Sequence, residues 1–240
     1  MSAPARPGIV VLTGSGISRE SGLHTFRDPG GIWSQVKLED VATPEAFARD
    51  PVRVHEFYNA RRNHLLSESV APNPAHLALA ELESRYQGEV LIVTQNIDNL
   101  HERAGSRNLI HMHGEGLKAR CGRCSGIVEW LKDLSIHDAC PACGERGAMR
   151  PDVVWFGETP LELDRIFDAL ARCGLFVAIG TSGAVYPAAG FVEQVRSRGG
   201  HTVELNIEPS LVHNRFAETI IGPASVVVPP FVAKILQVGW

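Results

Sequence analysis

An apolar run that ends in a group of polar side chains, between residues 89 and 99, constrains the fold of this chain most. Residues 89–94 form a short run rich in β-branched side chains and follow Gly88, which is typical of a buried strand in a parallel sheet. Residues 95–99, all polar except Ile97, come directly after this run. Open α/β sheets bind their ligands at the carboxyl ends of the strands, so these side chains are candidates for a binding site.

A second short strand is predicted at residues 108–110, and the histidines His111 and His113 follow it. The same pattern also fits a polar loop in which the histidines are structural and Asp98 caps a helix. Spacing alone leaves these two interpretations about equally supported.

A glycine turn follows the first predicted strand, residues 9–13. Gly14, Ser15 and Gly16 form this turn, and backbone N–H groups in such a turn can approach a pyrophosphate at a helix N-terminus. The next glycine is Gly22, so the dinucleotide pattern Gly-x-Gly-x-x-Gly is not met. Glycine turns after strands are also common for steric reasons alone.

Length and charge set broad limits on the function. The chain has 240 residues and a formal net charge of −4 without a basic run, which argues against nucleic acid as a partner. Residues 1–6 lack the apolar core of a signal peptide, and no stretch approaches the length of a membrane span. We therefore expect a cytoplasmic protein without membrane contact, and we expect a monomer.

Four of the five cysteines form two Cys-x-x-Cys pairs, Cys121 with Cys124 and Cys140 with Cys143, separated by fifteen residues. This arrangement predicts one structural zinc ion, because each pair can bring two thiolates to the same tetrahedral ion. Two disulfides or a redox motif are the alternatives, and a cytoplasmic location disfavours them.

Strands and helices alternate along the rest of the chain, which predicts an α/β fold with a doubly wound, Rossmann-like parallel sheet. Further strands are expected at 175–179 and 202–205, and residues 226–228 are expected to lead into a terminal helix. The predicted division is a disordered tail (1–8), a Rossmann-like domain (9–34, 74–118 and 149–240), a helical insertion (35–73) and a small zinc-binding module (119–148).

Taken together, the motifs resemble the sirtuin family, the NAD-dependent protein lysine deacylases, over nearly the whole chain. The matching segments, in the family's order, are 14–22 with Phe26-Arg27, Thr94–Asp98 with Leu100-His101, His113-Gly114, the two cysteine pairs, 150–158 and Gly180-Thr181-Ser182. One departure is Ser15, where the family usually has alanine, and its hydroxyl can hydrogen-bond to the pyrophosphate or crowd it.

The resemblance implies a reaction and its residues. In sirtuins an acyl-lysine carbonyl oxygen attacks the nicotinamide ribose, nicotinamide leaves, and a histidine acts as general base on a ribose hydroxyl. The products are free lysine, nicotinamide and O-acyl-ADP-ribose. The match gives the role of base to His113, with His101 and His111 as nearby rivals. Asn96 and Asp98 match residues of the nicotinamide pocket.

The resemblance also implies contacts to NAD. Phe26 and Arg27 match a loop that closes over the cofactor, Ser182 and Asn206 match contacts to phosphate and adenosine ribose, and Ala224 is expected beside the adenine. The full set of implied NAD contacts is Gly14, Ser15, Gly16, Ile17, Glu20, Ser21, Gly22, Thr25, Phe26, Arg27, Trp33, Gln95, Asn96, Ile97, Asp98, Gly180, Thr181, Ser182, Asn206, Ile207, Glu208 and Ala224.

The substrate is expected to be an acyl-lysine peptide. Segments 153–158 and 183–185 resemble the two edges between which sirtuins hold an extended peptide, and the implied contacts are Val154, Phe156, Gly157, Glu158 and Val185. Tyr58 and Arg61 project from one face of a predicted helix and resemble the Tyr-x-x-Arg of the subgroup that removes succinyl and malonyl groups. An exposed helix with incidental arginines is the alternative interpretation.

Two other functions fit the same fold. One is a non-catalytic reader of NAD or ADP-ribose, which has no use for a general base such as His113. The other is an NAD glycohydrolase or ADP-ribosyl transferase, which the peptide-binding segments disfavour.

Overall fold

The computed structural model describes residues 6–23 and 36–240. Within these residues the main sheet has six strands in the order β3-β2-β1-β7-β8-β9, and every neighbouring pair is parallel. The strands are β1 (Gly8–Thr13), β2 (Val90–Thr94), β3 (Leu109–His111), β7 (Cys173–Ile179), β8 (His201–Asn206) and β9 (Glu218–Ile221). This arrangement confirms the predicted α/β class with a parallel sheet.

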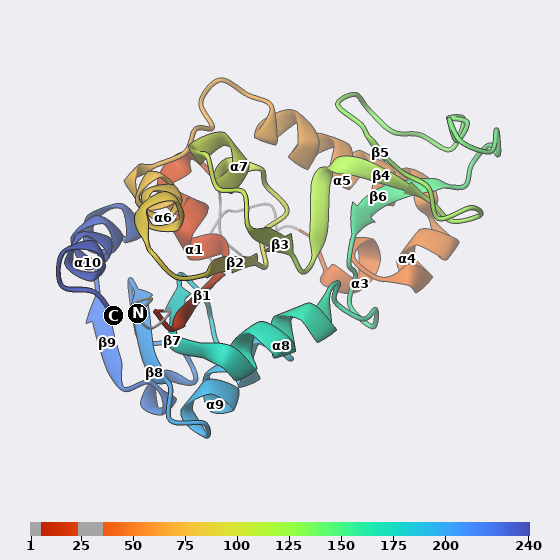
Figure 1. Cartoon of the computed structure of the whole chain (residues 1–240). Helices are drawn as coiled ribbons and strands as arrows, with labels where there is room; N and C mark the ends of the chain where they lie inside the picture. Colours follow the sequence, from red (N-terminus) through yellow and green to blue (C-terminus); the bar gives the residue numbers. More distant parts are fainter. Residues whose placement is uncertain (1–5, 24–35) are drawn as a thin grey trace.

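Helices cover both faces of the sheet (Figure 1). Because successive strand residues point to opposite faces, Ile9 and Val11 pack with α6 and α10, whereas Val10 and Leu12 pack with α8 and α9. The helices on the first face are α1 (Ser15–Ser18), α6 (Pro74–Arg85) and α10 (Ala224–Val238), and those on the second are α8 (Leu163–Arg172) and α9 (Phe191–Arg196). The elements 19–21 (η1), 188–190 (η2) and 213–215 (η3) are short 3-10 helices, and α7 (Leu100–Ala104) follows β2.

The strand order reverses between β1 and β7, and glycines at their ends let the two chain segments touch. Gly16 N–H donates to the carbonyl oxygen of Gly180 at 3.0 Å. A Cβ on Gly16 would lie 2.6 Å from the Cα of Gly180, so no larger side chain fits there. Parallel α/β sheets bind ligands at such a reversal, which places a crevice at the end of β1.

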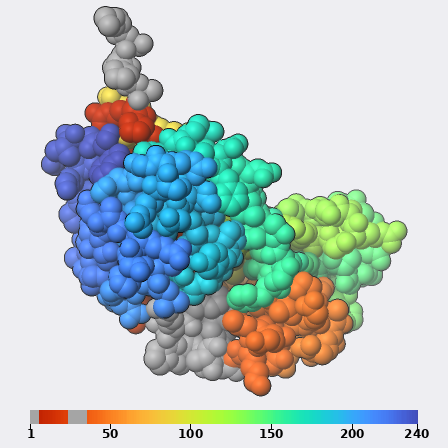
Figure 2. Space-filling view, turned by 90° about the horizontal axis from the view of Figure 1, so that it is seen from below, coloured from red at the N-terminus to blue at the C-terminus, as the bar shows by residue number. Residues whose placement is uncertain are grey.

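A smaller part of the molecule lies to one side of the main sheet (Figures 1 and 2). Among the described residues it contains an antiparallel sheet in the order β5-β4-β6. Its elements are β4 (Gly114–Cys121), β5 (Ile127–Glu129), β6 (Met149–Val153), α3 (Leu38–Val41), α4 (Pro44–Arg49) and α5 (Pro51–Leu65). The longest of them is α5, which begins at Pro51 after Asp50, whose side chain accepts from Arg53 N–H at 3.0 Å.

The structure differs from the predicted division in two places. Residues 114–118 and 149–153, assigned from the sequence to the Rossmann-like domain, belong to β4 and β6, which are neighbours in the small sheet. Residues 6–8, assigned to a disordered tail, are ordered, because Gly8 begins β1 and the Tyr86 hydroxyl donates to the carbonyl oxygen of Pro7 at 2.9 Å. Residues 1–5 of that tail lie outside the described part.

Residues 226–228, expected to lead into the terminal helix, lie inside it. These residues belong to α10, and the last strand of the main sheet is β9, at 218–221. Three consecutive valines favour a strand locally, but Val228, Val232 and Ile235 recur at helical spacing and are buried against the sheet. Packing of this apolar face therefore overrides the local preference. In the described part of the chain, no helix has the length and apolarity needed to cross a bilayer.

Candidate functional site

A cleft of about 1220 Å³ runs along the carboxyl ends of the main strands and on toward α5 and β6. Its walls include Gly14 and Gly180 at the strand reversal, and Tyr58 on α5 at the other side. Small-molecule sites commonly have volumes of roughly 300–1000 Å³, so this cleft is large enough for a dinucleotide together with a second, elongated group.

Most of the residues predicted for the site line this cleft. They are Gly14, Ser15, Gly16, Glu20, Tyr58, Arg61, Gln95, Asn96, Ile97, Asp98, His113, Val154, Phe156, Gly157, Glu158, Gly180, Thr181, Ser182, Val185, Asn206, Ile207, Glu208 and Ala224.

Of the seven remaining predicted NAD contacts, three are described and do not line the cleft. Ile17 is buried in the core on the α6 side, and Ser21 accepts a hydrogen bond from the Asn73 side chain at 2.9 Å behind the glycine turn. Gly22, at φ 89°, ends the short helix there. The other four, Thr25, Phe26, Arg27 and Trp33, lie outside the described residues.

His113 lies at the turn between β3 and β4 and faces the cleft. Its Nδ1 is 3.1 Å from the carbonyl oxygen of Gln95. A carbonyl oxygen only accepts, so Nδ1 carries the proton and Nε2 of the neutral ring carries a lone pair. Burial lowers the pKa of His113, and the bond to Gln95 opposes that shift only in part. The ring is therefore a neutral base near pH 7.

Asn96 is held by contacts on both sides of the strand reversal. Its Nδ2 donates to the carbonyl oxygen of Gly14 and to Ser18 Oγ, both at 3.1 Å, and its side chain is 8% exposed. With both amide hydrogens engaged, the remaining hydrogen-bonding atom of this side chain is its oxygen, an acceptor.

The Asp98 carboxylate accepts a hydrogen bond at the start of α7, and Asp98 also lines the cleft. One carboxylate oxygen accepts from Leu100 N–H at 3.1 Å and the other from Ser18 Oγ at 3.0 Å. Burial raises the pKa of this carboxyl above its ordinary value, while the two hydrogen bonds oppose the shift. The N-cap residue of α7 is Asn99, so Asp98 lies one position before the predicted cap, although its carboxylate accepts from the first N–H of the helix. This contact does not compete with a position in the site.

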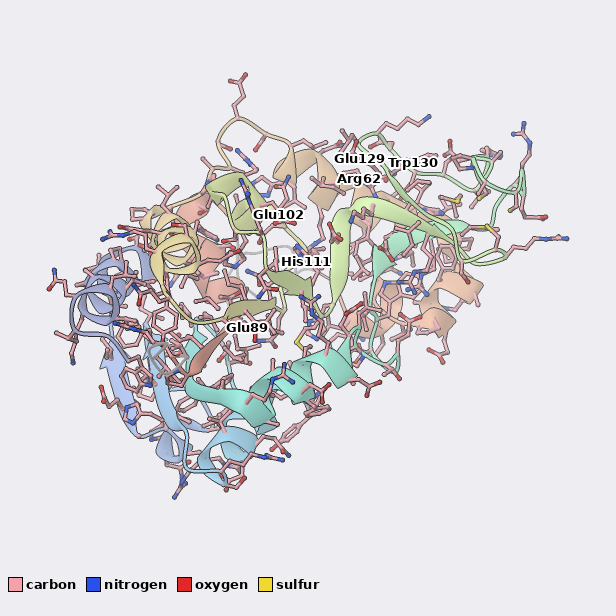
Figure 3. All side chains as sticks on the ribbon, viewed as in Figure 1. Arg62, Glu89, Glu102, His111, Glu129 and Trp130 are labelled. Carbon is pink, nitrogen blue, oxygen red and sulfur yellow. The ribbon has the colours of Figure 1, made fainter. Side chains whose placement is uncertain are left out.

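The two rival histidines point elsewhere. His101 Nε2 lies 3.0 Å from Thr13 Oγ1 in the core, and burial lowers the pKa of His101 well below its ordinary value. His111 Nε2 lies 2.8 Å from a Glu102 carboxylate oxygen (Figure 3), and its Nδ1 lies 3.2 Å from the carbonyl oxygen of Asn96. Burial alone would lower the pKa of His111, but the hydrogen bond and charge of Glu102 raise it. Of the three histidines, all within the described residues, His113 alone lines the cleft.

Tyr58 and Arg61 share one face of α5, as their spacing predicts, and both line the cleft. Tyr58 is 3% exposed, and burial raises its pKa to about 12, so the phenol keeps its proton over the whole neutral range. The Tyr58 hydroxyl accepts from the indole N–H of Trp155 at 3.0 Å. Burial lowers the pKa of Arg61, and the nearby Tyr58 and Asp98 oppose that shift.

Hydrogen bonds hold the segment after β6, both to His113 and within the segment. Val154 N–H donates to the carbonyl oxygen of His113 at 2.9 Å. Glu158 accepts from both terminal nitrogens of Arg150, at 2.6 and 2.9 Å, and from Trp155 N–H at 2.8 Å. The Glu158 carboxylate thus closes the turn at 155–158, in addition to lining the cleft.

At the far end of the cleft, polar side chains connect neighbouring strand ends. The Asn206 side chain donates to the carbonyl oxygen of Thr181 at 2.7 Å, which links β8 to the loop after β7. The Glu20 carboxylate accepts from Ser225 Oγ at 2.6 Å and from Ser225 N–H at 2.9 Å, so it caps the start of α10 beside Ala224.

The four paired cysteines come together at the tip of the small sheet. The Sγ atoms of Cys121 and Cys143 are 3.8 Å apart, and those of Cys124 and Cys140 are 3.7 Å apart. Four thiolates at about 2.3 Å from one zinc ion have Sγ–Sγ separations of about 3.8 Å, and disulfide sulfurs are about 2.05 Å apart. All four are free thiols within 4.8 Å of one another, so the set fits a closed tetrahedral zinc site.

Sequence reasoning missed two residues that organise the site. Ser18 connects Asn96 to Asp98 through its hydroxyl, and Trp155 donates to Tyr58. Both lie within segments that matched the family pattern, so the sequence did mark them as candidates for the site. Their partners lie 78 to 97 positions away along the chain, and only the folded structure identifies them.

Comparison with known proteins gives a consistent result. The Sir2 family matches residues 14–187. A protein of Vibrio cholerae named NAD-dependent protein deacylase is 56% identical over 98% of this chain and 96% of its own length. A solved Sir2 homologue–NAD complex has a TM-score of 0.86 and 38% identity, covering 96% of this chain and 91% of that one. A Sir2 structure with a deacetylated p53 peptide and 3′-O-acetyl ADP-ribose has a TM-score of 0.79 and 30% identity, covering 96% of this chain and 93% of that one.

Proposed function

The chain belongs to the Sir2 family, and from that premise we propose that it removes acyl groups from protein lysines in an NAD-dependent reaction. The relative from Vibrio cholerae carries the name of this activity, and the solved neighbours hold NAD, or a deacetylated peptide with an acetyl ADP-ribose. The observation that carries the proposal is the position of His113, which presents an unprotonated Nε2 to the cleft.

The residues at the strand reversal fit NAD. Gly14, Gly16 and Gly180 have no side chains, so backbone can approach a pyrophosphate closely, and Ser15 and Ser182 line the same stretch of cleft. Asn206 and Ala224 line the part of the cleft suited to the adenosine. NAD, when bound, supplies an electrophilic ribose carbon and nicotinamide as the leaving group.

His113, Asn96 and Asp98 then have separate roles in acyl transfer. His113 Nε2 takes the proton from a ribose hydroxyl, because Nδ1 already donates to Gln95. The Asn96 side-chain oxygen remains available to orient a hydroxyl or a water molecule. Asp98, with both oxygens fixed by Leu100 and Ser18, offers an acceptor for the nicotinamide carboxamide.

The acyl-lysine substrate is proposed to enter between segments 153–158 and 183–185, both on the cleft wall. Tyr58 and Arg61 then face the end of the acyl chain. A phenolic hydroxyl and a guanidinium beside one another match a carboxylate, so succinyl and malonyl groups are proposed as substrates in addition to acetyl. The zinc ion held by the four cysteines is proposed to be structural, because four thiolates leave no open coordination position.

One mass-spectrometric experiment tests the function. The protein is incubated with NAD and either an acetyl-lysine or a succinyl-lysine peptide, and the small products are identified. A deacylase yields the O-acyl-ADP-ribose that corresponds to each peptide. Release of nicotinamide with free ADP-ribose and an unchanged peptide would instead indicate a glycohydrolase, and binding of NAD without any product would indicate a reader.

A further inference from the structure

Trp155 makes a directional contact with Tyr58 inside the cleft. Its indole Nε1 lies 3.0 Å from the Tyr58 hydroxyl oxygen, and each side chain is 3% exposed. The two rings are 6.4 Å apart between centroids and tilted by 44°. Both residues line the same cleft as Arg61.

Trp155 is itself held in place from two sides. The Arg150 guanidinium lies 3.5 Å from the centre of the indole ring, a cation–π contact, and the same guanidinium is bonded to both carboxylate oxygens of Glu158. Glu158 in turn accepts from the backbone N–H of Trp155 at 2.8 Å. The direction of the indole N–H is therefore fixed by the surrounding structure.

The direction of this hydrogen bond has a chemical consequence. An indole N–H can only donate, so the Tyr58 oxygen is the acceptor in this contact. A phenolic proton prefers one of two positions in the plane of its ring, and an incoming N–H disfavours the position that faces it. The Tyr58 proton is thus directed away from Trp155.

We propose that Trp155 is a positioning residue for acidic acyl groups, which directs the Tyr58 proton toward the distal carboxylate of a succinyl or malonyl chain. This inference rests on the proposed deacylase function and deepens it, because it identifies a residue that sets acyl preference without touching the acyl group. An acetyl group is too short to present an acceptor at this place, so its removal does not depend on the direction of the Tyr58 proton.

The alternative role for Trp155 is packing. Its ring lies in an apolar cluster with Val41, Val54, Tyr58 and Val153. A residue that supported only the packing of the cleft wall would affect acetyl and succinyl substrates alike. The ratio of the two activities therefore separates positioning from packing.

The test compares kcat/KM for succinyl-lysine and acetyl-lysine peptides of the same sequence in Trp155→Phe, which keeps an aromatic ring and removes the N–H. The ratio of desuccinylation to deacetylation is expected to fall roughly three- to tenfold, the effect of one hydrogen bond. In a Tyr58→Phe background, which has no hydroxyl to direct, the same change is expected to leave the ratio of the two activities unaltered.

A second variant keeps the test decisive if phenylalanine disturbs the packing. Replacement of Trp155 by 3-benzothienylalanine retains the shape of the bicyclic ring and substitutes sulfur for the N–H, and it is expected to reproduce the selective loss. Equal losses on both peptides, or a selective loss that persists without the Tyr58 hydroxyl, would overturn the proposal.

Activity of the unmodified protein on the two peptides distinguishes failure of this proposal from failure of the proposed function. Deacetylation without desuccinylation would overturn the acidic acyl subsite and the role of Trp155, and would leave the deacylase function intact. Failure to deacylate either peptide would overturn the deacylase function and the assignment of Trp155 with it.

Discussion

The Nδ1 of His113 lies 3.1 Å from the carbonyl oxygen of Gln95, the first residue after β2. This contact determines which ring nitrogen holds the proton, and so which one is a base. It also ties the proposed base to the strand whose following residues, Asn96 and Asp98, line the same cleft.

Replacing His113 with alanine is expected to reduce deacylation by at least ~10², because it removes the proton acceptor for the ribose hydroxyl. Binding of NAD, measured by calorimetry, is expected to persist. The exposed His137 on the zinc module offers a matched control, and its replacement with alanine should leave turnover unchanged. Near-normal turnover without His113 would contradict the assignment of the base.

The pH dependence of the reaction follows from the same residue. Burial lowers the pKa of His113, so the free base persists to pH values below the usual histidine range. The acid limb of kcat/KM is therefore expected to have its midpoint below about 6.5, the ordinary histidine pKa. A midpoint above that value would indicate a different base or a different protonation state of His113.

The acyl subsite is tested by Arg61→Met, which removes the guanidinium and keeps a long apolar side chain. Desuccinylation is expected to fall roughly ten- to a hundredfold, the range for a charge-assisted contact, with deacetylation largely retained. Tyr58→Phe should act in the same direction and more weakly. Arg53→Met is a control on an exposed face of the same helix. Equal losses on both substrates would show that Arg61 supports the fold.

The zinc site is tested by Cys140→Ser. Loss of one thiolate is expected to release the metal and to lower stability by an amount on the order of several kcal/mol, because binding of a structural zinc ion contributes directly to folding. Metal content and thermal unfolding measure the two effects. Cys173→Ser is the matched control, since Cys173 lies in β7, away from the cluster. A metal-free protein of unchanged stability and activity would refute a structural zinc.

Stability is expected to depend on the buried histidines below neutral pH. His76 is 0% exposed, and burial lowers its pKa from 6.5 to about 4. Between these values the unfolded state binds a proton that the folded state does not, so the free energy of unfolding falls as the pH falls from 6.5 to 4. The full effect of this one residue is on the order of 3 kcal/mol.

The variant His76→Gln tests this origin, because glutamine does not take up a proton in this range and can still accept from Asn73 N–H, as His76 does at 3.4 Å. Urea unfolding at a series of pH values should show a shallower decline for this variant. The exposed His137→Gln should keep the original slope. An identical decline in all three proteins would assign the pH dependence to other groups.

Much of the fold follows from local patterns in the sequence. Continuous apolar runs bounded by glycine predicted β1 and β2, and Pro51 and Pro74 marked the starts of α5 and α6. Residues 226–228 were expected to lead into the terminal helix and instead lie within it, since three valines fit a strand and a helix whose apolar face continues to Ile235 equally well. A short β-branched run does not contain the information that distinguishes them.

The sequence predicted most residues of the site that lie within motifs, but not the contacts between motifs. The polar residues at the strand ends indicated a cleft wall, and the cysteine spacing indicated the cluster. The links between motifs were not predictable. The hydrogen bond from Trp155 to Tyr58 joins residues 97 positions apart, and that from Ser18 to Asp98 joins residues 80 apart. Such contacts depend on how β6, α5 and the glycine turn meet in space.

The most direct test of the central claim is the stoichiometry of the products over time, with NAD and an acetyl-lysine peptide. Deacylation by this site predicts one nicotinamide and one O-acetyl-ADP-ribose for every lysine freed, and no nicotinamide release when the peptide is omitted. Nicotinamide formed in excess of O-acetyl-ADP-ribose, or lysine freed with acetate as the initial product, would contradict it.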